Sequence, residues 1–107
     1  MNIGNLFLDT EPPVQGEKFE TLLTHKNLVV ERIVSSADTE PVEYVQAQDE
    51  WIVLVRGTAV LRRAGEVLAL TAGDYLFIPA GISHRVESTS DGALWLAVHL
   101  HPAPAAA

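Results

Sequence analysis

Residues 73–84 read GDYLFIPAGISH, and this stretch decides the fold that we expect. Gly73 is followed after five residues by Pro79, then by Gly81, and two residues later by His84. A glycine turn therefore leads into a short apolar strand, and a Pro-x-Gly turn separates that strand from the next. His84 stands where the next strand begins. The pattern predicts a barrel in which a histidine points from a rigid strand end into the enclosed space.

Length and composition favour one folded domain. The chain has 107 residues, of which 48% are hydrophobic, and at this size a domain can bury a sizeable core. It contains no cysteine, so disulfides and thiolate ligands or nucleophiles are excluded. We expect a core over about residues 19–101, an irregular N-terminal arm over residues 1–18 and a flexible tail over residues 102–107.

The charge of the chain bears on its partners and its location. The formal net charge is −7 and the pI is about 4.9, which disfavours binding to nucleic acid or to an anionic membrane surface. No apolar run approaches the ~20 residues of a membrane-spanning helix. The first residues lack the basic region of a signal peptide. We therefore expect a cytoplasmic protein whose partner is a small molecule.

Short strands fill the region between the arm and the tail. Turn signals recur every ~8–12 residues, which is typical of a β-sandwich or barrel. A short helix over residues 17–25 is the alternative at the start, and its threonine content disfavours it. The expected strands are residues 19–24, 28–34, 42–46, 51–56, 58–63, 66–70, 75–78, 84–88 and 94–100.

Two of these strands are apolar on both faces. Residues 51–55 read WIVLV and residues 94–98 read LWLAV, and such continuous runs indicate burial on both sides of a sheet. One side is the interior of the barrel. The other must be covered by the arm, by a second sheet or by another subunit, and we expect a homodimer.

The spacing of Gly73, Pro79, Gly81 and His84 resembles the second conserved motif of the cupin superfamily. Upstream, Glu50 is separated by six residues from a glycine, as in the first motif of that family. The resemblance covers roughly residues 28–100. It implies an all-β, single-domain cupin with a jelly-roll barrel, in which the first motif is only half present.

The same resemblance implies a metal site. In cupins, a His-x-His pair and a glutamate from the first motif, with the histidine of the second, commonly hold Fe, Mn, Zn, Ni or Cu. Here Glu50 and His84 match this set. The two histidine positions fall on Tyr44 and Gln46 if three residues separate the pair from Glu50, or on Glu43 and Val45 if four do, and neither spacing gives a histidine. A neutral amide and a phenol are poorer ligands for a divalent ion than imidazole. Together, Tyr44, Gln46, Glu50 and His84 also suit a pocket that orients a small polar ligand by hydrogen bonds.

A further histidine could complete a metal set. Strand alternation places Trp95, Ala97, His99 and His101 on one face of the last strand. If that face lines the barrel, His99 can join Glu50 and His84 in a two-histidine, one-carboxylate set for a divalent metal such as Fe, Mn, Zn or Ni. If the aliphatic face lines it, His99 points outward, and a shift of one residue in register reverses the outcome.

Three functions stay open at this point. One is a metal-dependent enzyme of unknown reaction, since the fold does not specify the chemistry. Another is a metal-free module that binds or senses a small molecule. The last is a structural dimer whose pocket has no function. We expect a pocket that binds a small polar ligand, and a divalent metal held by Glu50, His84 and His99.

Overall fold

The computed structural model describes residues 3–103, and within that range it contains eight β-strands and no helix, hence none that could cross a membrane. Eight of the nine expected strands are therefore confirmed, and their bounds differ from expectation by at most two residues at either end. The strands are β1 (Glu17–His25), β2 (Leu28–Ser35), β3 (Asp49–Arg56), β4 (Thr58–Arg63), β5 (Glu66–Thr71), β6 (Tyr75–Ile78), β7 (His84–Thr89) and β8 (Ala93–Leu100).

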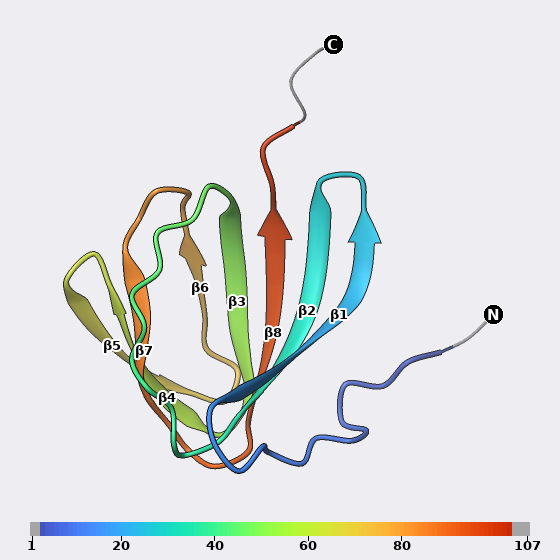
Figure 1. Ribbon diagram of the computed structural model, residues 1–107, viewed down its shortest axis with the longest axis vertical. Helices are drawn as coiled ribbons and strands as arrows, with labels where there is room; N and C mark the ends of the chain where they lie inside the picture. The colour runs from blue at the N-terminus through green and yellow to red at the C-terminus, as the bar shows by residue number, and fades with distance from the viewer. Residues whose placement is uncertain (1–2, 104–107) are drawn as a thin grey trace.

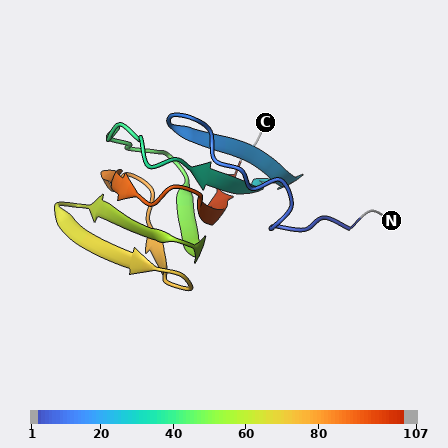
Figure 2. The ribbon, with the colours of Figure 1, turned by 90° about the horizontal axis from the view of Figure 1, so that it is seen from below.

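The strands form two antiparallel sheets (Figure 1). The larger sheet has the order β1-β2-β8-β3-β6, and the smaller has the order β5-β4-β7. Seen from below, the two sheets lie around a common interior (Figure 2). This arrangement confirms the expected all-β fold.

The strand predicted over residues 42–46 is wrong. Only Tyr44 pairs there, exchanging both backbone hydrogen bonds with His84 at 2.8 and 3.0 Å. Two residues later, the carbonyl of Gln46 accepts a hydrogen bond from Gly81, in the turn that precedes β7. Because the segment bonds to β7 at one residue and to a turn at another, no continuous ladder forms.

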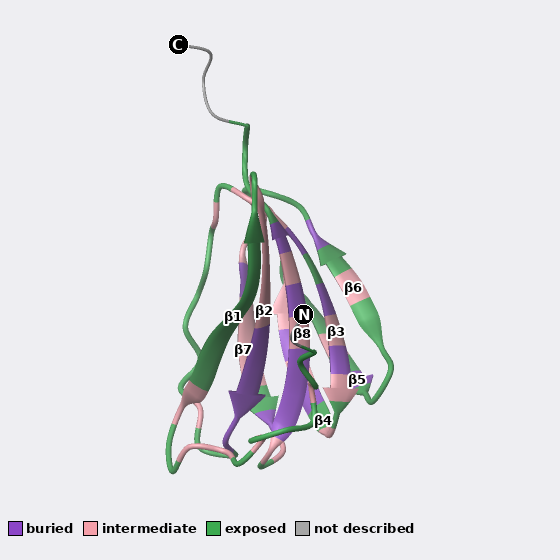
Figure 3. Cartoon of the chain, turned by 90° about the vertical axis from the view of Figure 1, so that its right-hand side faces the viewer, coloured by how far each residue is buried: buried purple, intermediate pink, exposed green. Residues whose placement is uncertain are grey.

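The hydrophobic core fills one end of the barrel, around Trp95. Trp95 on β8 lies opposite Leu54 on β3, and both are fully buried. The indole Nε1 donates a hydrogen bond of 3.0 Å to the hydroxyl of Ser35. Buried residues are concentrated in β2, β8 and β3, whereas β1 is exposed along nearly its whole length (Figure 3).

The N-terminal arm ends earlier than expected and docks through its backbone. β1 begins at Glu17, so the irregular arm stops before the predicted residue 18. Arg32, which is buried on β2, donates to the carbonyl of Leu6 at 3.0 Å and to that of Leu8 at 2.5 Å. The side chains of Phe7 and Leu8 stay exposed. Of the predicted tail, residues 104–107 lie outside the described residues.

Two glycines allow a matched test of the turns. Gly57 and Gly73 both have left-handed backbones, with φ of 95° and 94°. A Cβ on Gly57 would lie 2.6 Å from the hydroxyl of Ser90, whereas one on Gly73 would meet nothing within 4 Å. We expect Gly73→Ala to lower the free energy of unfolding by about 1 kcal/mol through backbone strain. Gly57→Ala should lower it by about 2–4 kcal/mol, because it adds a steric clash.

Urea unfolding of both variants measures this difference. The clash also displaces the Ser90 hydroxyl, which accepts a hydrogen bond of 2.9 Å from the Thr58 backbone. Equal losses in the two variants would contradict the close packing at Gly57.

Candidate functional site

A cavity of about 330 Å³ lies in the barrel, beyond the Trp95 end of the core. Its apolar walls come from both sheets and include Ile52 on β3 and Leu61 on β4. The five residues that the sequence singled out all line this cavity, and they are Tyr44, Gln46, Glu50, His84 and His99.

Glu50 and His84 form the central pair of the cavity. Both are nearly buried, with 6% and 9% of their surface exposed. The Nε2 atom of His84 lies 3.8 Å from Oε1 of Glu50. Its Nδ1 donates to the carbonyl of Ile82 at 3.2 Å, because a carbonyl can only accept. Gln46 donates its amide to Oε1 of Glu50 at 2.9 Å.

The local sequence explains why these two side chains meet. Glu50 is the second residue of β3, and His84 is the first residue of β7. In the Pro-x-Gly turn, Gly81 adopts a φ of 81°, a left-handed conformation that residues with a side chain disfavour. This turn leads the chain to His84. The turn chemistry of residues 79–84 therefore sets the position of the imidazole.

His99 lies on the wall of the cavity, on the same face of β8 as Trp95. Its Nε2 donates to Oε1 of Glu31 at 2.9 Å, and the amide of Gln48 donates to its Nδ1 at 3.4 Å. The hydrogen bond to Glu31 raises the pKa of His99, and burial opposes this rise. His99 is only 8% exposed, so its imidazole is oriented by these two neighbours.

Two carboxylates of the cavity were missed by the sequence analysis. Glu31 alternates with Val29 and Ile33 on the inward face of β2. In the sequence, a carboxylate between two apolar residues on one strand face could have indicated that Glu31 lines the cavity. Glu17, which was assigned to the arm, begins β1 and accepts a hydrogen bond of 2.6 Å from Ser35. Burial raises the pKa of Glu17.

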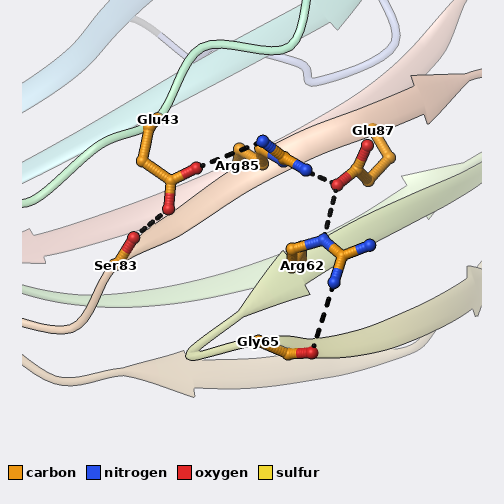
Figure 4. A network of polar contacts seen from close by, with 6 residues as sticks. All are labelled: Glu43, Arg62, Gly65, Ser83, Arg85 and Glu87. Carbon is orange, nitrogen blue, oxygen red and sulfur yellow. Dashed lines mark hydrogen bonds and ion pairs between the residues drawn. The ribbon is translucent and has the colours of Figure 1, made fainter.

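Tyr44 closes part of the mouth of the cavity. Its half-exposed ring stacks on the imidazole of His84, with ring centroids 5.8 Å apart. The preceding residue, Glu43, points the other way and pairs with Arg85 at 3.6 Å, while Ser83 donates to its carboxylate (Figure 4). The outward contacts of Glu43 therefore help to hold Tyr44 over the pocket.

The side chains as they lie do not fit the predicted metal set. Within residues 3–103, no group of three or more histidine, cysteine, aspartate or glutamate side chains is placed to hold a metal ion. The Nε2 of His99 is occupied by Glu31, and Gln46 presents its N–H to Glu50. Glu50 and His99 are thus engaged in hydrogen bonds with other side chains, and with His84 they do not form a group placed to hold one ion.

The His99–Glu31 pair predicts a dependence of stability on pH. Because folding raises the pKa of His99 above its ordinary value of ~6.5, the stabilisation is fully present below that pH and is lost as the pH rises through the folded pKa. We expect Glu31→Gln to remove this part of the pH dependence. Urea unfolding at pH values from 5.5 to about 9, compared with the exposed control His25→Ala, measures it. Identical pH profiles for wild type and Glu31→Gln would contradict the pairing.

Comparisons with known proteins agree on the family. The family model described as Cupin domain matches residues 29–101. The chain is similar to a candidate mannose-6-phosphate isomerase from Ralstonia eutropha JMP134, with 38% identity, 95% of this chain and 100% of that chain covered, and a TM-score of 0.83.

More distant structures share the fold. An RmlC-like cupin from Shewanella frigidimarina NCIMB 400 has 21% identity, 86% and 82% coverage and a TM-score of 0.75. The Clostridium difficile EutQ protein has 22% identity, 88% and 75% coverage and a TM-score of 0.69. No curated protein matches the chain. With its second motif, its two antiparallel sheets and this match over residues 29–101, the chain belongs to the cupin family.

Proposed function

We propose that the barrel cavity binds a small polar molecule, and that it does so without a metal ion. The observation that carries this proposal is the buried pair of Glu50 and His84 inside a cavity of about 330 Å³ whose surface is mostly apolar. Small-molecule sites are commonly concave and apolar, with a few convergent polar groups that orient the ligand. Gln46 and Tyr44 add an amide and a phenol to the same wall.

The name of the Ralstonia relative points to a phosphorylated sugar, but the cavity does not support one. Among the described lining residues there is no lysine or arginine, which are the side chains that pair with phosphate. Glu17, Glu31 and Glu50 line it in addition, and a phosphate dianion would be repelled by them. We therefore propose a ligand without a phosphate group.

Acid–base catalysis is a second candidate, and the position of Glu50 favours it. Glu50 lies 3.8 Å from His84 and directly opposite His99 in the β3–β8 register. A carboxylate between two imidazoles supplies groups that can take a proton from a bound molecule and return it. The reaction supported by this arrangement is a proton transfer within the ligand.

The metal-dependent alternative requires two side chains of the cavity to give up their present hydrogen bonds. For Glu50, His84 and His99 to hold Fe, Mn, Zn or Ni, His99 would have to leave Glu31, and Gln46 would have to turn its amide away from Glu50. Elemental analysis of protein purified without chelator distinguishes the two proposals.

We also propose a cytoplasmic location, which fits the absence of cysteine from the sequence.

Thermal unfolding with panels of polyols, amines, amino acids and carboxylic acids tests the binding proposal. A ligand at 100 times its Kd should stabilise the protein by about 2.7 kcal/mol. We expect this gain in wild type and in His25→Ala, and its loss in His84→Ala. Exchange of ligand C–H protons in D₂O, followed by NMR, tests catalysis in the same samples.

Two outcomes would contradict the proposal. One is stoichiometric Fe, Mn, Zn or Ni that His84→Ala removes, which would favour the metal-dependent alternative. The other is the absence of stabilisation by every compound in the panels.

We further propose that the protein is a homodimer, joined through an aromatic patch on the outer face of the large sheet. The patch consists of Trp51 on β3 and of Tyr75 and Phe77 on the edge strand β6, and all three side chains are exposed. The rings of Trp51 and Tyr75 lie 5.5 Å apart. Clustered exposed aromatic side chains are typical of interfaces.

Light scattering coupled to gel filtration tests the dimer. We expect Phe77→Glu to convert a dimer to a monomer, because it places a charge in the apolar interface. Val67→Glu, at an exposed position on β5 of the other sheet, is the matched control and should leave the dimer intact. A monomeric wild-type protein at micromolar concentration, or a dimer that survives Phe77→Glu, would contradict this patch as the interface.

A further inference from the structure

We infer that the ligand of this cavity is a small organic amine bound as its ammonium ion, an inference that rests on the proposed function and names its ligand class. The basis is the electrostatic imbalance of the walls. Glu17, Glu31 and Glu50 line the cavity, and within residues 3–103 no lysine or arginine does. The molecule as a whole is negatively charged, like the walls of the cavity, with a formal net charge of −7.

Glu50 is the carboxylate that lacks a cationic partner at hydrogen-bonding distance. Glu31 has such a partner in His99, at 2.9 Å. Glu17 accepts a hydrogen bond of 2.6 Å from Ser35. Glu50 accepts one from the neutral amide of Gln46, although it is only 6% exposed. A buried carboxylate without a counter-charge is costly, so a cation that enters the cavity removes a cost already present in the free protein.

His84 presents a second acceptor at the same point. Its Nδ1 donates to Ile82, and no described residue hydrogen-bonds its Nε2, which is the acceptor atom of an imidazole protonated at Nδ1. This atom belongs to a side chain that is about nine-tenths buried and lines the cavity. It lies 3.8 Å from Oε1 of Glu50, too far for a hydrogen bond between them. An ammonium group has several N–H donors and can bridge the two acceptors.

Three arginines of the surrounding strands bind other groups, and none of the three lines the cavity. Arg32 binds carbonyls of the N-terminal arm and pairs with Glu20 on the outer face. Arg62 and Arg85 both pair with Glu87, at 2.8 and 2.6 Å, on the outside of the small sheet (Figure 4). Among the described lining residues there is no lysine or arginine, and the ammonium ion of a ligand would supply the counter-charge of Glu50.

The rest of the cavity suits the body of such an amine. Its walls include the aromatic rings of Phe19, Tyr44 and Trp95 and the aliphatic side chains of Ile52 and Leu61. Aromatic faces attract an ammonium ion within about 6 Å, and aliphatic walls favour a compact hydrocarbon body. Phe19 and Tyr44 are both partly exposed, so they lie where a ligand would enter.

Isothermal titration with three probes of similar shape tests this inference: cyclohexylamine, cyclohexanol and cyclohexanecarboxylate, at pH 7.5 with 50 mM and 300 mM salt. We expect cyclohexylamine to bind at least tenfold more tightly than cyclohexanol, and cyclohexanecarboxylate not to bind. Glu50→Gln should abolish the preference for the amine while binding of cyclohexanol persists. Glu66→Gln, an exposed glutamate on β5, is the matched control and should keep the preference.

The possible results separate the two proposals. Equal binding of cyclohexylamine and cyclohexanol, or tighter binding of the carboxylate, overturns the amine inference and leaves the proposal of a small-molecule pocket standing. An amine preference that survives Glu50→Gln also overturns it, because the cation would then be bound elsewhere. If neither these probes nor any compound of the wider panels binds, both proposals fail.

Discussion

The pairing of β3 with β8 is the constraint on which the rest of this molecule depends. In this ladder Leu54 lies opposite Trp95. Four residues before Leu54 on β3 and four residues after Trp95 on β8, Glu50 lies opposite His99. The first pair belongs to the packed core, where Trp95 also borders the cavity, and the second pair lines the cavity. Because side chains alternate strictly along a strand, a shift of one residue would turn both pairs outward together. Core stability and pocket chemistry are therefore specified by the same register, and the fully buried Trp95 fixes the register for both.

Local turn chemistry made much of this fold predictable. The glycines and the proline of residues 73–84 define a strand, a turn and the start of β7, so the position of His84 followed from neighbouring residues alone. The wrong prediction of a strand over residues 42–46 has the opposite cause, because it depended on contacts distant in the sequence. That segment carries strand-forming residues, but its partners are His84 and Gly81, about 40 residues away, and they accept it at only two points. Strand propensity depends strongly on such distant context.

The candidate site was predictable in its membership and not in its contacts. Motif spacing identified Glu50, His84, Tyr44 and Gln46 as neighbours, and all four line the cavity. The hydrogen bond between His99 and Glu31 could not be foreseen, because it requires β2 and β8 to be adjacent in the sheet. That contact changes the chemistry of the pocket, since it engages the nitrogen that a metal ion would have needed.

If three residues separate the histidine pair of the first cupin motif from its glutamate, Tyr44 and Gln46 stand at the two histidine positions, and this has a physical consequence beyond the lack of two ligands. An imidazole at the position of Gln46 would be a ligand for a metal ion whose charge could balance Glu50, whereas the amide of Gln46 donates a neutral hydrogen bond to Glu50. Glu50 is nonetheless only 6% exposed, and most of the cavity surface around it is apolar. A neutral hydrogen bond offsets only part of the cost of burying a carboxylate. A cation bound beside Glu50 would remove that cost, so recognition explains the imbalance at Glu50 better than folding does.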